Sequence, residues 1–269
     1  MRQSNQSPPP ASQNTLSPDI MKFALLSTLF AAATAFQAAP AARTSGVALH
    51  ETKADLVAIA EKANPIVNFY DPMNLAESDF YDWGSEGTIG WLRQAEIKHG
   101  RIAMFAFVGY IVHANGIHWP WPMNLEGGQW PTGASPPEIW DNMGPAAKWQ
   151  IFAVISALEL WDECGGGKLP HYTKGRKPGQ YPDFEVLRGT IGHPIFNLYD
   201  PFNLAKNMSE EKKANRLVME INNGRLAMLG IFGFLSAQKV EGSVPLLKGV
   251  VPHYDGEVMQ PFTDFSYFN

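Results

Sequence analysis

Cysteine is almost absent from this chain, which has a single one, Cys164. One cysteine cannot form an intramolecular disulfide, so a disulfide framework is excluded, and so is a zinc site built on cysteines. Basic residues show no excess either, since 21 Lys and Arg stand against 26 Asp and Glu. The net charge of −5 argues against nucleic acid as a partner, because a phosphate-binding surface needs a basic stripe.

Long hydrophobic runs and catalytic signatures are also missing. No stretch offers the roughly 20 uninterrupted apolar residues of a simple membrane-spanning helix. The sequence contains no nucleophile elbow, no phosphate-binding loop and no zinc signature, so we predict that it is not an enzyme. Aromatic residues, by contrast, are plentiful, with 16 Phe and 8 Trp, while charged residues make up only 17%. This composition is typical of a membrane protein or of a protein that surrounds apolar molecules.

The first 50 residues have the form of a two-part targeting sequence. Lys22 precedes an apolar run that ends in the small residues 33–35, which is the form of a secretory signal peptide. The segment that follows contains Arg43 and no acidic residue, as transit peptides do. A buried N-terminal helix is the alternative. We expect three parts: an extension with a signal peptide at 1–35, a transit-like segment at 36–50 and one functional domain at 51–269.

One charged pattern occurs twice, 124 residues apart. Residues 96–109 read EIKHGRIAMFAFVG and residues 220–233 read EINNGRLAMLGIFG, with 7 of 14 positions identical. The similarity extends upstream, because NFYDPMNLAE at 68–77 matches NLYDPFNLAK at 197–206. In these turns Pro fixes the backbone and Asp can cap it. The chain therefore contains a duplicated unit, which is a Tyr-Asp-Pro turn followed by a helix with charges at its start.

Three segments are hydrophobic enough to span a bilayer as helices, at about 89–114, 146–161 and 217–240. Loop charges support three spans, because residues 115–147 include no Lys or Arg whereas residues 163–216 include nine. The positive-inside bias places the N-terminus and the second of these loops on one side of the membrane. A soluble helical protein is the alternative, because the first and third segments carry charges in their opening turns.

The spacing within the repeat predicts that each acid pairs with the arginine of the other copy. Glu96 and Arg101 are five residues apart, which is roughly 140° round a helix, so they point away from each other. Glu220 and Arg225 have the same spacing. An unpaired charge would cost several kcal/mol in the hydrocarbon region. We therefore expect two crossed ion pairs, Glu96 with Arg225 and Glu220 with Arg101.

These pairs can form if the two helices cross at Gly100 and Gly224, where the absent side chains permit close approach. Duplicated membrane units usually pack about a pseudo-two-fold axis. We therefore predict an all-α membrane protein with three transmembrane helices, of which the first and third are related by such an axis.

The motif E-I-x-[HN]-G-R-[IL]-A-M in the first and third of three helices resembles the light-harvesting chlorophyll-binding family. Together with the two-part leader it is most similar to the chlorophyll a/c antennae of red-lineage algae, and the resemblance covers about residues 65–260. It implies chlorophyll a, chlorophyll c and a carotenoid of the fucoxanthin or peridinin type as cofactors. It also implies axial ligands to chlorophyll magnesium at Glu96, His99, Glu220 and Asn223, with Arg101 and Arg225 as the cross-paired charges.

Further candidate ligands lie on the middle helix and near the end of the third helix. Gln150 and Glu159 of the middle helix occupy family-like ligand positions, although either could instead be an interfacial polar residue. The third helix departs from the family pattern, because the usual Gln or Glu is Ala237 here, and Gln238 beside it is the substitute candidate. Among the remaining histidines, which we interpret as surface or interface residues, His118 is the best candidate for an additional ligand.

The resemblance implies a light-harvesting antenna in the plastid thylakoid membrane, with its N-terminus in the stroma. Its expected partners are the core of photosystem I or II, other antenna subunits and thylakoid lipid. Two alternatives have other functions. A photoprotective quencher of the same family would need acidic residues that sense pH in the 115–147 loop. A small transporter with duplicated helices would usually have inverted repeats, whereas the loop charges give both copies the same orientation.

Overall fold

The computed structural model describes residues 51–123, 127–130, 135–185, 208–258 and 261–262. The chain divides into two units, Met1–Ser45 and Gly46–Asn269, and every described residue belongs to the second. The expected signal peptide and transit-like segment therefore lie outside the described residues. So does the second Tyr-Asp-Pro turn, at 199–201.

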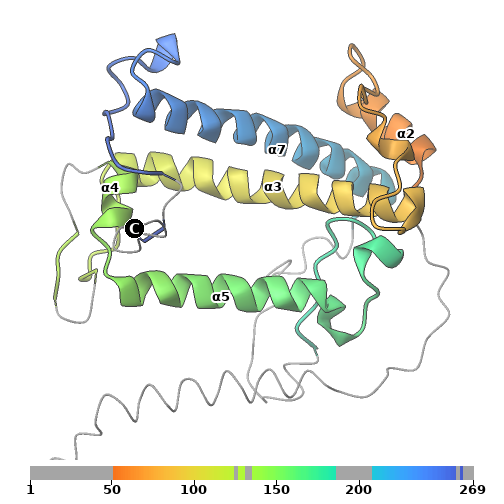
Figure 1. Cartoon of the computed structure of the whole chain (residues 1–269), viewed down its shortest axis with the longest axis horizontal. Coiled ribbons are helices and arrows are strands. Elements are labelled where there is room, and N and C mark those ends of the chain that lie inside the picture. The colour runs from red at the N-terminus through yellow and green to blue at the C-terminus, as the bar shows by residue number, and fades with distance from the viewer. Residues whose placement is uncertain (1–50, 124–126, 131–134, 186–207, 259–260, 263–269) are drawn as a thin grey trace, which may run out of the picture. The chain divides into compact units, whose positions relative to one another are not determined.

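Helices and turns make up the described part of the chain, which contains no strand. The three long helices are α3 (Gly84–Ala114), α5 (Pro145–Glu163) and α7 (Glu210–Lys239), and Figure 1 shows α3 and α7 side by side. Two short helices are α2 (Lys53–Ala63) and α4 (Pro136–Asp141), and single 3-10 turns lie at Leu75–Glu77, Gly165–Gly167, Tyr172–Lys174 and Pro245–Leu247. The fold is all-α, as the sequence predicts.

Helices α3 and α7 begin earlier than the hydrophobic pattern indicates, because polar side chains bond to the backbone of their first turns. Ser209 precedes α7, and its side chain accepts a hydrogen bond from the Lys212 N–H at 3.4 Å. Asp79 Oδ1 accepts the Gly84 N–H at 2.8 Å at the start of α3. Pro145 occupies the first turn of α5, where its missing N–H costs no hydrogen bond. Hydropathy detects the apolar body of a helix but not its polar first turn.

Within the described residues, no helix combines the length and the apolar character that crossing a membrane requires. The expected segments 89–114, 146–161 and 217–240 coincide with α3, α5 and α7 to within one residue at their C-terminal limits or lie inside them. Their assignment as three membrane spans stays a prediction.

The seam between α3 and α7 is built from matched positions of the repeat. Four of its residues are small or β-branched and at most 8% exposed: Ile97 and Ala103 on α3, with Ile221 and Ala227 on α7. Between them, a Cβ added to Gly100 would lie 3.1 Å from the Gly224 Cα. The two backbones are therefore in contact at the glycines, which only residues without a side chain permit.

The first Tyr-Asp-Pro turn is closed by its aspartate. Asp71 accepts hydrogen bonds from the N–H groups of Ala76 and Leu75, both at 2.9 Å. These two bonds favour the carboxylate and hold the pKa of Asp71 below its ordinary value. The turn therefore leads the chain from α2 to α3 with its backbone donors satisfied.

A buried polar cluster joins α3 to the end of α5. Asp162 is 1% exposed, and its carboxylate accepts hydrogen bonds from Gln94 Nε2 and Arg176 Nη2, each at 3.0 Å. Gln94 Oε1 in turn accepts the Gly179 N–H at 2.7 Å. The cluster fixes the 164–180 segment against α3, where a Cβ on Gly90 would lie 2.5 Å from the Tyr172 carbonyl oxygen.

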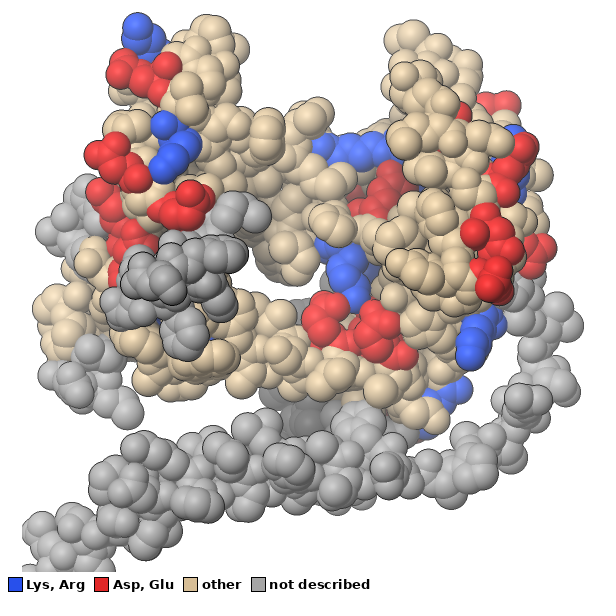
Figure 2. Space-filling view, viewed as in Figure 1, with Lys and Arg blue, Asp and Glu red and all other residues tan. Residues whose placement is uncertain are grey.

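At the opposite end of α5, the C-terminal segment contacts α4. The Tyr254 hydroxyl donates to Asp141 Oδ2 at 2.5 Å, and burial together with this bond raises the pKa of Tyr254 to about 12. Trp140 Nε1 donates to the Pro261 carbonyl oxygen at 2.9 Å. Between its two attached ends, α5 stands apart from α3, and Figure 2 shows an opening there with basic and acidic side chains at one end.

Candidate pigment-binding site

Two reciprocal ion pairs connect α3 and α7 beside the contacting glycines. Arg225 Nη2 lies 2.6 Å from Glu96 Oε1, and Arg225 Nε donates to the same oxygen at 2.8 Å. Arg101 Nε donates to Glu220 Oε1 at 2.6 Å. Each acid is thus paired with the arginine of the other helix, which is the arrangement that the five-residue spacing predicts. Together the four side chains carry no net charge.

The two pairs differ in their surroundings. Glu96 Oε2 also accepts a hydrogen bond from Arg93, whose Nε donates to Glu51 Oε2 at 3.1 Å. Glu220 Oε2 accepts no hydrogen bond from any described residue. Sequence reasoning missed Arg93, although its position three residues before Glu96, on the same helix face, could have identified it.

His99 and Asn223 hold equivalent positions of the repeat, and both are exposed. His99 Nδ1 lies 2.8 Å from the Ala95 carbonyl oxygen. Because a carbonyl oxygen can only accept, Nδ1 carries a proton, and in a neutral imidazole Nε2 then has the lone pair. A neutral imidazole with a free Nε2 is the form that ligates a metal, and the carbonyl fixes its orientation.

On α5, Glu159 repeats the arrangement of Glu220, with one oxygen bound to a cation. Its Oε2 accepts from Lys98 Nζ at 2.6 Å, and the same ammonium group lies 2.9 Å from Asp162 Oδ2. Glu159 Oε1 accepts no hydrogen bond from the residues that the structure describes. Gln150, five residues into α5, is exposed.

Lys98 is a second residue that sequence reasoning did not assign. Its counterpart in the repeat is Asn222, whose Nδ2 donates to the Ala63 carbonyl oxygen at the end of α2 at 2.9 Å. This position therefore attaches each copy to a different neighbour, α5 in one case and α2 in the other. The sequence signal for this role was the difference between Lys98 and Asn222 within an otherwise similar motif.

Gln238 lies in the interior rather than on an exposed helix face. Its side chain is fully buried, and its Oε1 accepts a hydrogen bond from the Tyr110 hydroxyl at 2.9 Å. Its Nε2 is buried without a partner in the described chain. An axial ligand needs an outward lone pair, so this geometry does not support the predicted ligand role of Gln238.

Exposed apolar side chains flank the candidate ligands on both helices. They occur every three residues and at matched positions of the repeat: Ile102, Phe105 and Val108 on α3, and Leu226, Leu229 and Phe232 on α7. All six are between 60% and 79% exposed. Exposed apolar stripes of this kind mark contacts with apolar partners.

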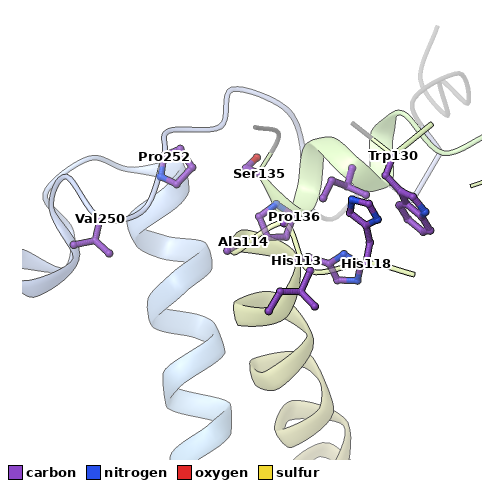
Figure 3. A pocket seen from close by; sticks show the side chains of 11 residues that line it. His113, Ala114, His118, Trp130, Ser135, Pro136, Val250 and Pro252 are labelled. Carbon is purple, nitrogen blue, oxygen red and sulfur yellow. The ribbon is translucent and has the colours of Figure 1, made fainter. Parts of the chain in front are cut away.

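A small cavity of about 150 Å³ lies beyond the C-terminal end of α3. Figure 3 shows that His113, His118, Trp130 and Ser135 are among the residues that line it. The His118 ring stacks on Trp130 with centroids 5.5 Å apart, and the Ser135 Oγ is buried without a hydrogen-bond partner among the described residues. His118 therefore belongs to a partly polar pocket rather than to an isolated surface position.

No group of three or more His, Cys, Asp or Glu side chains in the described chain is arranged to hold a metal ion. Five candidate ligands instead stand singly on the helix surfaces, each exposed or with an unbonded carboxylate oxygen: Glu220, Glu159, His99, Asn223 and Gln150. Single donor atoms beside exposed apolar stripes suit magnesium held in a macrocycle, because the ring supplies the other ligands and an apolar surface to cover. These are the features that a pigment-binding protein needs.

Comparison with known proteins identifies the kind of pigment-binding protein. The family model for the chlorophyll A-B binding protein matches residues 57–239, so the chain belongs to the chlorophyll a–b binding protein family. It is a light-harvesting chlorophyll-binding protein and not an enzyme.

Curated relatives match over most of the chain. A chloroplastic fucoxanthin-chlorophyll a-c binding protein of Trieres chinensis is 30% identical over 234 residues, which are 84% of this chain and 98% of the relative. The fucoxanthin-chlorophyll a-c binding protein F of Phaeodactylum tricornutum is 29% identical over 221 residues, 82% of this chain and 96% of the relative. A third, protein E of Macrocystis pyrifera, is 32% identical over 179 residues, 64% of this chain and 70% of the relative.

Proposed function

We propose that the chain is an antenna protein of the plastid thylakoid membrane that passes absorbed energy to photosystem I or II. The single observation that carries this proposal is the pair of crossed Glu–Arg contacts, which neutralises a helix pair while leaving ligand atoms outward. The names of the relatives support chlorophyll a, chlorophyll c and a carotenoid of the fucoxanthin type as cofactors. When bound, these pigments supply the absorption of light and the transfer of excitation.

The chain's own contribution is to position each magnesium through one donor atom. Glu220 Oε2 and Glu159 Oε1 are carboxylate oxygens without a hydrogen bond in the described chain, and each partner oxygen is held by a cation. His99 offers Nε2, while Asn223 and Gln150 offer exposed amide oxygens. Glu96 is the remaining member of the set, and we leave Gln238 out because its side chain is buried.

The membrane arrangement belongs to the same proposal. We place spans on α3, α5 and α7, with α3 and α7 related by a pseudo-two-fold axis near Gly100 and Gly224. The reciprocal ion pairs and the matched apolar stripes support this symmetry. Carotenoid, chlorophyll and lipid would then cover the exposed stripes, and pigment would fill the opening beside α5 in Figure 2.

An antenna role is favoured over a quencher of the same family. A luminal pH sensor needs carboxylates that are free to respond to protons. The 115–147 loop has three acidic residues, of which Glu126 lies outside the described residues. Of the other two, Glu138 Oε2 accepts the Ser135 N–H at 2.6 Å, and Asp141 accepts the Tyr254 hydroxyl. Both carboxylates therefore have structural roles in capping and packing.

An absorption spectrum tests the function directly. The protein, refolded in detergent with an algal pigment extract and purified, should show chlorophyll bands in the Soret and red regions. Excitation of its carotenoid should produce chlorophyll fluorescence, because an antenna brings the pigments close together. A purified protein without these bands would contradict pigment binding, and bands without energy transfer would contradict the antenna role.

The loop charges predict the topology. Proteinase K added to the stromal face of intact thylakoids should cut within 163–216, where Lys168 and Lys174 are exposed. Residues 115–147 should stay intact until the membrane is permeabilised. Early cleavage in 115–147, with protection of 163–216, would reverse the proposed orientation.

A further inference from the structure

The two glutamates of the repeat are chemically unequal, although their motifs match. Glu96 has both carboxylate oxygens engaged, Oε1 by Arg225 and Oε2 by Arg93. Glu220 has only Oε1 engaged, by Arg101 at 2.6 Å. An atom that coordinates magnesium must direct a lone pair at it, and a hydrogen bond from a guanidinium group competes for that lone pair.

The sequence explains the inequality at one position. Arg93 lies three residues before Glu96, and the residue three before Glu220 is Leu217. Leucine cannot donate a hydrogen bond, and Arg216, four residues before Glu220, makes no hydrogen bond to it, so Glu220 Oε2 has no competing donor among the described residues. The second copy therefore lacks an arginine at the position equivalent to Arg93, although the core motif is repeated.

Arg93 is itself held in place. Its side chain is 7% exposed, and its Nε donates to Glu51 Oε2 at 3.1 Å. Glu51 lies two residues before the first residue of α2, which Figure 1 shows beside the starts of α3 and α7. The charges of Glu51, Arg93, Glu96 and Arg225 sum to zero, so each charge in the cluster is paired without pigment. The Nη2 of Arg93 is buried and makes no hydrogen bond within the described chain.

We propose that Arg93 is a positioning residue that makes the pigment site at Glu96 fill after the site at Glu220. The inference rests on the proposed function, since it concerns chlorophyll bound at these glutamates. Chlorophyll at Glu96 must displace or share the Arg93 hydrogen bond, whereas chlorophyll at Glu220 meets an unbonded oxygen. We expect half-filling of the Glu96 site to need on the order of tenfold more chlorophyll, which corresponds to about 1.4 kcal/mol.

The test is a chlorophyll a titration during refolding, in which each site is followed by a difference spectrum. One site is removed together with its ion pair, so that no charge is left unpaired. The unaltered protein is therefore compared with two pair-deletion variants, Glu96→Leu with Arg225→Leu and Glu220→Leu with Arg101→Leu. The first difference reports the filling of the Glu96 site, and the second reports the filling of the Glu220 site.

The decisive variant gives the first site the chemistry of the second. Arg93→Leu combined with Glu51→Gln removes one charge of each sign and frees Glu96 Oε2. The two sites should then half-fill at similar chlorophyll concentrations, with the Glu220 site unmoved. Arg93→Lys keeps the charge and should leave the Glu96 site the later one to fill.

A second variant makes the opposite change at the other site and leaves the contacts of Glu51 intact. Leu217→Arg places a guanidinium three residues before Glu220 and should delay filling of the Glu220 site alone. Equal half-filling of the two sites in the unaltered protein would overturn the inference, and so would an unchanged order in both Arg93→Leu with Glu51→Gln and Leu217→Arg. If the unaltered protein retained no chlorophyll at any concentration, the proposed function itself would fall.

Discussion

Arg101→Leu should cause the largest loss of bound chlorophyll of any single arginine substitution in the helix pair. Arg101 is the only described residue that donates a hydrogen bond to Glu220, and its Nη1 also donates to the Gly179 carbonyl oxygen at 2.8 Å. Breaking one member of a buried pair costs on the order of 3–5 kcal/mol. Because both side chains are about 30% exposed, we expect roughly 2 kcal/mol here. Chlorophyll retained per polypeptide after refolding measures the effect.

The matched control is Arg225→Leu, at the equivalent position of the repeat. The sequence alone predicts equal effects for the two arginines. The structure predicts a smaller loss for Arg225→Leu, because Glu96 keeps its hydrogen bond from Arg93. Equal losses from the two substitutions would show that Arg93 does not compensate Glu96.

Rescue by a second substitution tests the crossing of the pairs. Glu220→Gln should restore chlorophyll binding to Arg101→Leu, because glutamine is neutral and still offers an oxygen. Glu96→Gln should not restore it, since that change leaves Glu220 unpaired and removes the partner of Arg225. For Arg225→Leu the order reverses, with rescue by Glu96→Gln only. Rescue by either glutamine alike would mean that the charges do not pair across the helices.

Gly224→Ala should destabilise the helix pair more than any other small substitution in the repeat. The added Cβ would lie 2.9 Å from the Gly100 Cα and 3.4 Å from its carbonyl carbon. Both are backbone atoms that cannot rotate away, so the helices must separate. Overpacking of this kind costs roughly 1–3 kcal/mol, and the separation would also lengthen both ion pairs. The thermal midpoint of the refolded protein should fall, and Gly224→Leu should prevent refolding with pigment.

Gly233→Ala is the control for this prediction. Gly233 lies on the same helix and is also a repeated glycine, matched by Gly109, but an added Cβ would meet no atom within 4 Å at either position. Alanine is favoured over glycine inside a helix by up to about 1 kcal/mol. Gly233→Ala should therefore leave the thermal midpoint unchanged or raise it. A similar fall for both alanine substitutions would exclude the close helix contact as the cause.

The charged core of the fold could be predicted because it depends on spacing within helices. Glu96 and Arg101 cannot meet on one helix, so the repeat itself implies contacts between copies. The buried cluster around Asp162 could not be predicted in this way. Its partners Gln94, Arg176 and Gly179 come from segments without a repeat or a period, and only the packed chain brings them together.

Gln238 and Arg93 show where reasoning from a motif reaches its limit. The position of Gln238 one residue beyond the family's ligand suggests an outward ligand displaced by a rotation. In the structure the side chain turns inward to Tyr110, because burial and the hydrogen bond from a tyrosine decide its direction. Arg93 lies outside the repeated motif, and its effect on Glu96 depends on Glu51, which is 42 residues away along the chain.

The sequence by itself determined the class of this protein, its helical core and the identity of the crossed charges. Each of these follows from local spacing and from a duplicated motif, and helix geometry translates spacing directly into direction. Only the tertiary structure decided which oxygen of each glutamate is free. That property depends on which distant donor reaches each oxygen, and donors such as Arg93 and Lys98 are set by the packing of whole helices and turns. Matching motifs therefore occupy unequal surroundings, and the difference lies in the neighbours rather than in the motif.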